Sequence, residues 1–214
     1  IGVIPGTVFG LITFDNEFVI EGEGAVKYFA EDEIPWIEYM NEIVAIEVRE
    51  GVTLLREYTL GKLPNVETIS LPSSLVSVET STFAMTNNYD SIVFPNGTSI
   101  FTYEDRTLYS VDKDILYVHS NKNVTTDYTI DSAVEVIAEY AFANNQNIIT
   151  INVTSNPTLL EGAFSNAKSL ETINGQIGGT KISAYAFEGC NKLSGIELSE
   201  TLETIGSYAF SDCN

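Results

Sequence analysis

Large apolar residues recur along the chain at intervals of 22 or 23 positions. Phe83, Leu60 and Ile37 form one run spaced by 23 residues. A second run consists of phenylalanines that follow an alanine, at Phe142, Phe164, Phe187 and Phe210. Units this short cannot bury an apolar face alone, so the period predicts a solenoid of about seven to eight stacked coils.

Each unit also carries an apolar pair, nine and eleven residues after its anchor position. This alternation places both members on one face of a short strand, which stacking would bury. The pairs are Ile46/Val48, Ile69/Leu71, Ile92/Phe94, Ile151/Val153 and Ile196/Leu198. The coil at Ile173 departs from the pattern, because Gly175 stands at the second position in a glycine-rich segment.

The register breaks once, between Phe83 and Phe142, which are 59 residues apart, or one coil of 23 and an enlarged coil of 36. Two apolar stretches there flank Asp112-Lys113-Asp114, which predicts an inserted hairpin at about residues 100–122. Insertions in repeat proteins map to one face, often the binding face. We therefore expect a ligand to meet this hairpin.

The pattern offers two candidate contact surfaces. The residue between each apolar pair points away from the core, and this strand face is small and polar. Its candidate contacts are Glu47, Ser70, Thr129, Asn152, Asn174 and Glu197. The hairpin supplies amphipathic side chains, which interfaces favour: Tyr103, Tyr109, Tyr117 and His119. The aromatic residues have a second interpretation, packing of the hairpin onto the solenoid flank, since strands favour tyrosine regardless of a ligand.

The charge balance narrows the choice of partners. The 214 residues include 30 Asp and Glu against 10 Lys and Arg, a formal net charge of −20. Such a field repels phosphate backbones and anionic lipid, so we expect no nucleic-acid partner, whereas basic proteins and divalent cations remain plausible. The sequence has no run of 18 or more apolar residues, so we expect no membrane insertion, and we expect a monomer.

The sequence contains no recognisable catalytic, cofactor-binding or metal-binding motif. His119 is the single histidine, and we interpret it as a surface loop residue rather than a general base or ligand. Acidic clusters at 15–17, 31–33 and 112–114 could attract calcium but match no calcium-loop spacing, and turn carboxylates are the favoured interpretation. Cys190 and Cys213 share one column, which favours packed free thiols over a disulfide or metal pair.

The repeat "YAFEGCNKLSGIELSETLETIGSYAF" resembles the BspA-like leucine-rich repeats, and "TLYSVDKDILYVHSNKNVTTDYTI" resembles the enlarged coil of those proteins. Gly22-Glu23-Gly24, Pro35-Trp36 and Tyr39 resemble their leader, a short hairpin with a Gly-x-Gly turn followed by a Pro-Trp-x-x-Tyr element. The resemblance implies a right-handed, β-rich leucine-rich-repeat solenoid with short helical turns. We expect a capping segment at 1–36, with Trp36 covering the first coil, and a solenoid at 37–214 that stops within a repeat.

The same resemblance implies export, because members are mostly surface or secreted proteins of host-associated bacteria and some parasitic protists. We therefore expect a non-catalytic extracellular or cell-surface module that binds protein or glycan ligands on host or microbial surfaces. Two alternatives remain open. The chain could be a structural spacer that presents other domains, or an accessory domain of a secreted enzyme.

Overall fold

The computed structural model describes residues 8–30 and 33–213. Short strands dominate the described residues, and helix is confined to two 3-10 turns, η1 (Ile37–Tyr39) and η2 (Thr80–Phe83). One row of strands consists of β1 (Val8–Ile12), β2 (Glu17–Gly22), β4 (Ala45–Val48), β6 (Thr68–Ser70), β8 (Ser91–Val93), β12 (Asp127–Thr129), β14 (Thr150–Asn152) and β16 (Thr172–Asn174). A two-stranded ladder, β17 (Gln176–Ile177) and β19 (Glu197–Leu198), lies at the C-terminal end.

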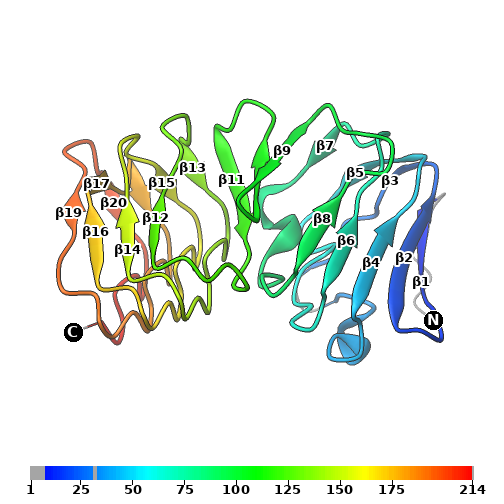
Figure 1. Cartoon of the computed structure of the whole chain (residues 1–214), viewed down its shortest axis with the longest axis horizontal. Coiled ribbons are helices and arrows are strands. Elements are labelled where there is room, and N and C mark those ends of the chain that lie inside the picture. Colours follow the sequence, from blue (N-terminus) through cyan, green and yellow to red (C-terminus); the bar gives the residue numbers. More distant parts are fainter. Residues whose placement is uncertain (1–7, 31–32, 214) are drawn as a thin grey trace.

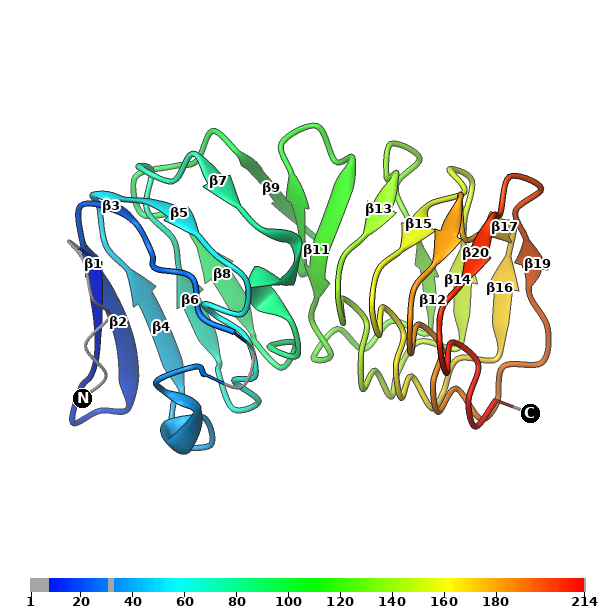
Figure 2. The ribbon, with the colours of Figure 1, turned by 180° about the vertical axis from the view of Figure 1, so that it is seen from behind.

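The opposite row of strands lies behind the first in Figure 1 and in front of it in Figure 2. It consists of β3 (Gly24–Ala25), β5 (Val52–Leu55), β7 (Ser77–Val78), β9 (Phe101–Glu104), β10 (Thr107–Ser110), β11 (Ile115–His119), β13 (Val136–Ile137), β15 (Thr158–Leu159), β18 (Lys181–Ile182) and β20 (Thr204–Ile205).

Each regular coil adds one strand to each row, which gives a β-solenoid of about seven turns with roughly 23 residues per coil. In the first row β1 pairs antiparallel with β2, and the paired strands from β2 onward run parallel and in the register that the period predicts. Glu47 pairs with Ser70 and Ser70 with Val93. The predicted solenoid and its period are therefore confirmed.

Both rows are interrupted at the same place along the axis. Within the described residues, β8 and β12 belong to different sheets, and so do β7 and β9. The strands β9, β10 and β11 fill this position as an antiparallel meander, and β11 then pairs with β13 in parallel. The predicted hairpin around Asp112–Asp114 is the β10–β11 connection. The sequence pattern did not predict the β9 strand or its turn at Asp105 and Arg106, both of which have positive φ.

The meander is a wall between two hydrophobic cores, not a projection from one face. Leu108 and Tyr117 belong to the core of the N-terminal half, whereas Tyr109 and Leu116 belong to the core of the C-terminal half. All four side chains are buried. Figure 1 shows β9 and β11 between the two halves. The expectation that a ligand would meet an accessible hairpin face is wrong for β10 and β11, because the two cores cover both faces of these strands.

The N-terminal end carries the predicted aromatic cap. Trp36 is 3% exposed and packs against Phe18 and Phe29, with ring centroids 4.8 and 5.8 Å apart. The hairpin of this region joins β1 to β2 through the turn at 13–16, whereas Gly22 and Gly24 form the corner between β2 and β3. The division at residue 36 stays a prediction, but both parallel ladders begin before it, at the pairings β2–β4 and β3–β5.

The phenylalanine column forms a continuous stack in the C-terminal half. Adjacent rings of Phe142, Phe164, Phe187 and Phe210 have centroids 4.9, 5.3 and 5.3 Å apart and are nearly parallel. Spacing along the axis is set by backbone bonds, since the N–H of each of the first three residues donates to the carbonyl that precedes the next phenylalanine. Offset stacking adds about 0.5–1.5 kcal/mol per pair beyond burial.

His119 occupies the next position of this column. It lies 23 residues before Phe142, its ring centroid is 5.0 Å from that of Phe142, and its N–H donates to Ala141 as the phenylalanines do to their neighbours. The side chain is fully buried, so the prediction of a surface loop histidine is wrong. Stepping back by one period from Phe142 would have located it.

The glycine-rich coil changes the register of the first row. Leu198 pairs with Ile177 rather than with Gly175, and Glu197 pairs with Gln176. Gly175 has φ +104, and a Cβ atom at this position would lie 2.0 Å from the carbonyl oxygen of Val153. The backbone therefore approaches the preceding coil more closely than any side chain allows, and Ile177 supplies the apolar contact that position 175 lacks.

The two cysteines are free, as predicted. Each thiol donates to a backbone carbonyl a little more than one period upstream: Cys190 to Phe164 and Cys213 to Phe187, both at 3.1 Å. Burial raises the pKa of Cys190 to about 12, so this thiol stays protonated at neutral pH. The column thus uses cysteine as a small packed residue with a weak donor.

We predict that Gly175→Ala lowers the free energy of unfolding by about 3 kcal/mol, because both the left-handed backbone and the contact with Val153 oppose a side chain. Gly97→Ala is the matched control, since Gly97 has φ +82 but a Cβ atom at that position would have no neighbour within 4 Å. That variant should lose about 1 kcal/mol from backbone strain alone. Chemical denaturation measures both, and equal losses would contradict the packing argument.

We predict that His119 makes the stability depend on pH. Burial lowers its pKa from 6.5 to about 3, so the neutral ring stabilises the fold above pH 6.5, and this contribution is lost as the pH falls towards 3. Between about pH 7.5 and about pH 5, the loss should reach about 2 kcal/mol. His119→Phe should lack it.

The measurement is the difference between the unfolding free energies of the wild type and His119→Phe at each pH. The carboxylates of this acidic chain titrate in both proteins, so their effect cancels in the difference. A constant difference across this pH range would contradict the assignment.

Candidate binding surface

Three of the four hairpin candidates are inside the molecule. Tyr109 is 3% exposed, Tyr117 is 7% exposed and His119 is fully buried, whereas Tyr103 is partly exposed. Burial raises the pKa of Tyr117 to about 12. The alternative interpretation from the sequence was packing of the hairpin onto the solenoid flank. The structure buries these three side chains, but between the two cores rather than on a flank.

Two of the buried candidates, Tyr109 and His119, are joined by one chain of hydrogen bonds across the wall. The Tyr109 and Tyr128 hydroxyls are 2.7 Å apart, the Tyr128 hydroxyl lies 2.8 Å from Thr107 Oγ1, and that oxygen lies 2.8 Å from His119 Nδ1. His119 Nε2 has no hydrogen-bond partner among the described residues. The network holds the strands of the wall in register. It also gives the buried hydroxyls hydrogen-bond partners, without which their burial would destabilise the fold.

On the first row, the predicted strand-face residues are accessible. In the C-terminal half, Thr129, Asn152 and Asn174 lie side by side on β12, β14 and β16. The Asn174 amide donates to Asn152 Oδ1 at 2.9 Å, and the Asn152 amide donates to Asp127 Oδ1 at 2.5 Å. These side chains form a line of polar groups across three strands, and hydrogen bonds between neighbours hold them in place.

Glu197 extends this surface, but it does not lie beside Asn174, where the period of 23 residues would place it. Its carboxylate accepts a hydrogen bond from the Gln176 side chain at 3.0 Å, because the glycine-rich coil brings Gln176 rather than Asn174 next to it. Side-chain amides and carboxylates therefore continue to the C-terminal end of the described chain.

In the N-terminal half, Glu47 and Ser70 line a shallow hollow of about 390 Å³, together with Arg49, Glu50, Pro72, Pro95 and Asn96. The Arg49 guanidinium donates to Glu47 at 2.9 Å and also to Glu21. These two ion pairs hold the guanidinium in place on the surface. Exposed ion pairs of this kind contribute little to the stability of the fold.

Glu50 fixes the rim of the same hollow. Its carboxylate accepts hydrogen bonds from the Asn96 side chain, from the hydroxyl and N–H of Ser73 and from the N–H of Ser74, all at 2.9–3.0 Å. The bond from Asn96, followed by the bonds from Ser73 and Ser74, lowers the pKa of Glu50 to about 2. The loops that follow β4, β6 and β8 are thereby tied together.

A second hollow of about 360 Å³ lies at the interruption of the first row, beside β12. It is lined by Asp105, Asn123, Thr125, Asp127, Tyr128 and Thr129. Asp105 comes from the β9–β10 turn, and the Asn123 amide donates to its carbonyl at 3.0 Å. Thr129 was predicted from the sequence, but the other lining residues were missed, because the interruption is visible only once the strand pairing is known.

The described residues contain no cluster of side chains that could hold a metal ion, that is, no group of three or more His, Cys, Asp and Glu. In the cluster at 112–114, Lys113 forms ion pairs with Glu104 and Asp131, and Asp114 accepts a hydrogen bond from Ser110. Glu31 and Asp32 of another acidic cluster lie outside the described residues.

The described part of the chain has no helix of sufficient length and apolar character to cross a bilayer.

No curated protein matches the chain. Among solved structures, the chain is similar to the pneumococcal vaccine antigen PcpA, with 20% identity and a TM-score of 0.71 over 81% of this chain. The match covers 44% of the PcpA chain, so the present chain spans less than half of that protein's length.

A leucine-rich cell surface protein from Faecalibacterium prausnitzii is also similar, with 13% identity and a TM-score of 0.60, covering 99% of this chain and 86% of that protein. At these identities the likeness establishes the fold. The family model described as "BspA type Leucine rich repeat region" matches residues 38–126 and 116–214, with six repeat copies. This chain therefore belongs to the BspA-type leucine-rich repeat family.

Proposed function

We propose that this chain is a non-catalytic extracellular or cell-surface binding module that contacts protein or glycan ligands on host or microbial surfaces. The contact surface is the strand face, defined as Glu47, Ser70, Thr129, Asn152, Asn174, Glu197 and the two hollows beside β4 and β12. Family membership and the likeness to a bacterial cell-surface protein and a pneumococcal antigen support this proposal.

The observation that carries the proposal is the ordered line of Asp127, Asn152 and Asn174. Neighbouring side chains already restrict these groups, so a ligand would immobilise them at a small entropic cost. Each amide also keeps hydrogen-bonding capacity that its neighbours do not use. A regular array of this kind suits a ligand with repeated polar groups, such as an extended peptide or an oligosaccharide.

The strand face lacks a cluster of exposed aromatic residues among the described side chains, and such clusters usually dominate tight interfaces. A single module should therefore bind with modest affinity, and repeated modules or copies would raise the avidity. The net charge of −20 favours association with basic partners and makes the rate of association fall as salt increases.

A structural spacer is the second candidate function. Stacked aromatic rings in the C-terminal half and the doubly buried wall favour a stiff rod. Such a rod could present other domains without a ligand of its own, and a role as accessory domain of a secreted enzyme would use the same rigidity. Neither alternative requires the strand face to contact anything.

We predict that the double variant Thr129→Arg/Asn174→Arg abolishes saturable binding to any ligand that the wild type recognises on this face. Both positions are exposed, so the new side chains should not disturb the core. The measurement is surface plasmon resonance against immobilised fibronectin, laminin, collagen and a glycan array, with thermal denaturation to confirm folding.

The matched control is Ser77→Arg/Thr204→Arg, which adds the same charge at exposed positions of the opposite row. It should bind like the wild type. Equal loss in both double variants would move the interaction away from the strand face. No saturable binding by the wild type would contradict a binding module and favour the spacer.

A further inference from the structure

The interruption of the first row leaves one edge of β12 without a neighbouring strand. Within the described residues, β12 pairs with β14, and no strand pairs with its other edge. Figure 1 shows β12 at the end of its sheet, facing the meander and β8 across the interruption. A strand edge exposes a row of backbone donors and acceptors that can pair with another chain.

The hydrogen bonds of β12 show which of its backbone groups face this edge. The Thr126 carbonyl accepts from Thr150, and the Ile130 N–H donates to the Asn152 carbonyl, so both groups face β14. Because backbone direction alternates along a strand, the N–H and carbonyl groups of Asp127 and Thr129 face the open edge. The Asp127 carbonyl accepts one hydrogen bond from the Thr125 hydroxyl at 3.1 Å and keeps a second lone pair for an added strand. Both residues are exposed.

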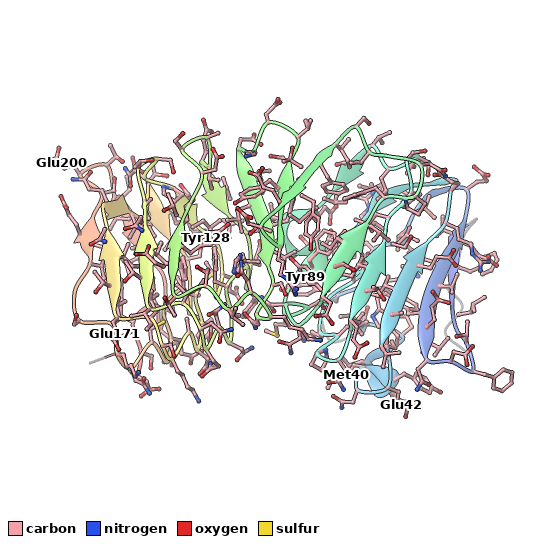
Figure 3. All side chains as sticks on the ribbon, viewed as in Figure 1. Met40, Glu42, Tyr89, Tyr128, Glu171 and Glu200 are labelled. Atoms are coloured by element: carbon pink, nitrogen blue, oxygen red, sulfur yellow. The ribbon has the colours of Figure 1, made fainter. Side chains whose placement is uncertain are left out.

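The edge of β8 on the other side of the interruption is covered by a side chain. Tyr103, on β9, is partly buried and lies beside the backbone of Ile92 on β8, and its ring packs against Tyr89 with centroids 6.5 Å apart. Figure 3 shows Tyr89 and Tyr128 on opposite sides of the interruption. The two edges are therefore not equivalent, and the hollow of about 360 Å³ lies against β12.

The negative charge of this hollow favours a basic ligand. Asp105 and Asp127 line it, whereas none of its lining residues is basic. Arg106 and Lys122, which adjoin the lining residues Asp105 and Asn123 in the sequence, both form ion pairs with Asp90. An added strand would thus meet backbone hydrogen-bonding groups along one edge and two carboxylates beside it.

We propose that β12 is a docking edge for an extended basic peptide segment of a partner protein, which adds as a further strand in the interruption of the first row. Backbone pairing with Asp127 and Thr129 supplies the affinity, and lysine or arginine side chains at alternate positions reach Asp105 and Asp127. This inference rests on the proposed binding function and names its partner class.

The test uses a fluorescein-labelled peptide, acetyl-Lys-Thr-Lys-Val-Lys-Thr-Lys-amide, and the full chain. Fluorescence anisotropy measures binding at about 50 mM and about 500 mM salt, to separate charge from backbone pairing. We expect a dissociation constant on the order of 10–100 µM at low salt. Hydrogen exchange of the complex should show protection of the Thr129 amide.

The decisive variant is Thr129→Pro. Proline removes the N–H that faces the open edge, and it leaves intact the bonds of Thr126 and Ile130 to β14. We expect at least about tenfold weaker binding with little change in melting temperature. If Thr129→Pro unfolds the chain, a peptide with N-methyl groups at alternate residues replaces it, and that peptide should bind about tenfold more weakly at unchanged charge.

The matched control is Ile205→Pro, on the exposed edge strand β20. It should bind the peptide like the wild type, and loss of binding in this variant alone would overturn the assignment to β12. Asp105→Asn/Asp127→Asn should weaken binding several-fold and reduce its salt dependence. Equal affinity of the N-methylated and unmodified peptides would show that charge alone holds the peptide, which also overturns the proposal.

Failure of this inference is distinguishable from failure of the proposed function. If matrix proteins or glycans bind the wild type and Thr129→Arg/Asn174→Arg abolishes that binding, the strand face is a binding surface whatever the basic peptide does. A peptide that does not bind then removes strand addition alone.

Discussion

The whole molecule depends on a two-sided wall. The strands β10 and β11 bury Leu108 and Tyr117 against the N-terminal core and Tyr109 and Leu116 against the C-terminal core. Within the described residues, β11 pairs with β13 of the C-terminal half, but no strand of the wall pairs with a strand of the N-terminal half, so side-chain burial and hydrogen bonds must make that junction. Fully burying one side chain of this size contributes about 1.5–3 kcal/mol, so the wall outweighs the few backbone bonds that the interruption forgoes.

Hydrogen bonds also join the wall to the two halves, at positions beyond the apolar contacts. The Tyr89 hydroxyl donates to the carbonyls of Arg106 and Val118, and the Asn87 amide donates to the carbonyls of Tyr140 and Ala141. His119 continues the aromatic column into the wall, so the C-terminal stack begins at the joint itself. The interruption therefore leaves the edge of β12 open on the strand face, while these contacts keep the two halves joined. In this way one insertion can create a site in a regular repeat.

The sequence predicted the period, most strands of the first row, the packed position of Trp36 and the free cysteines, because stacking forces equivalent residues into equivalent environments. It did not predict the strands of the opposite row outside the inserted hairpin. It did not predict the wall, although a signal was present: Ile115 to Val118 is a continuous apolar run, which is typical of a strand buried on both faces rather than one. The single histidine was interpreted by residue type, although its position one period before Phe142 was informative. The docking edge of β12 could not be predicted from the sequence, because which strands pair with each other is known only in the folded chain.

The most direct test of the wall's role is native-state hydrogen exchange on both sides of it. If one wall closes both cores, opening either half exposes the other, so the slowest amides of β6 and β14 should exchange with the same free energy and the same dependence on denaturant. A clearly lower opening free energy for one of these strands would show that the halves unfold independently. That result would contradict the claim that the wall holds the molecule together.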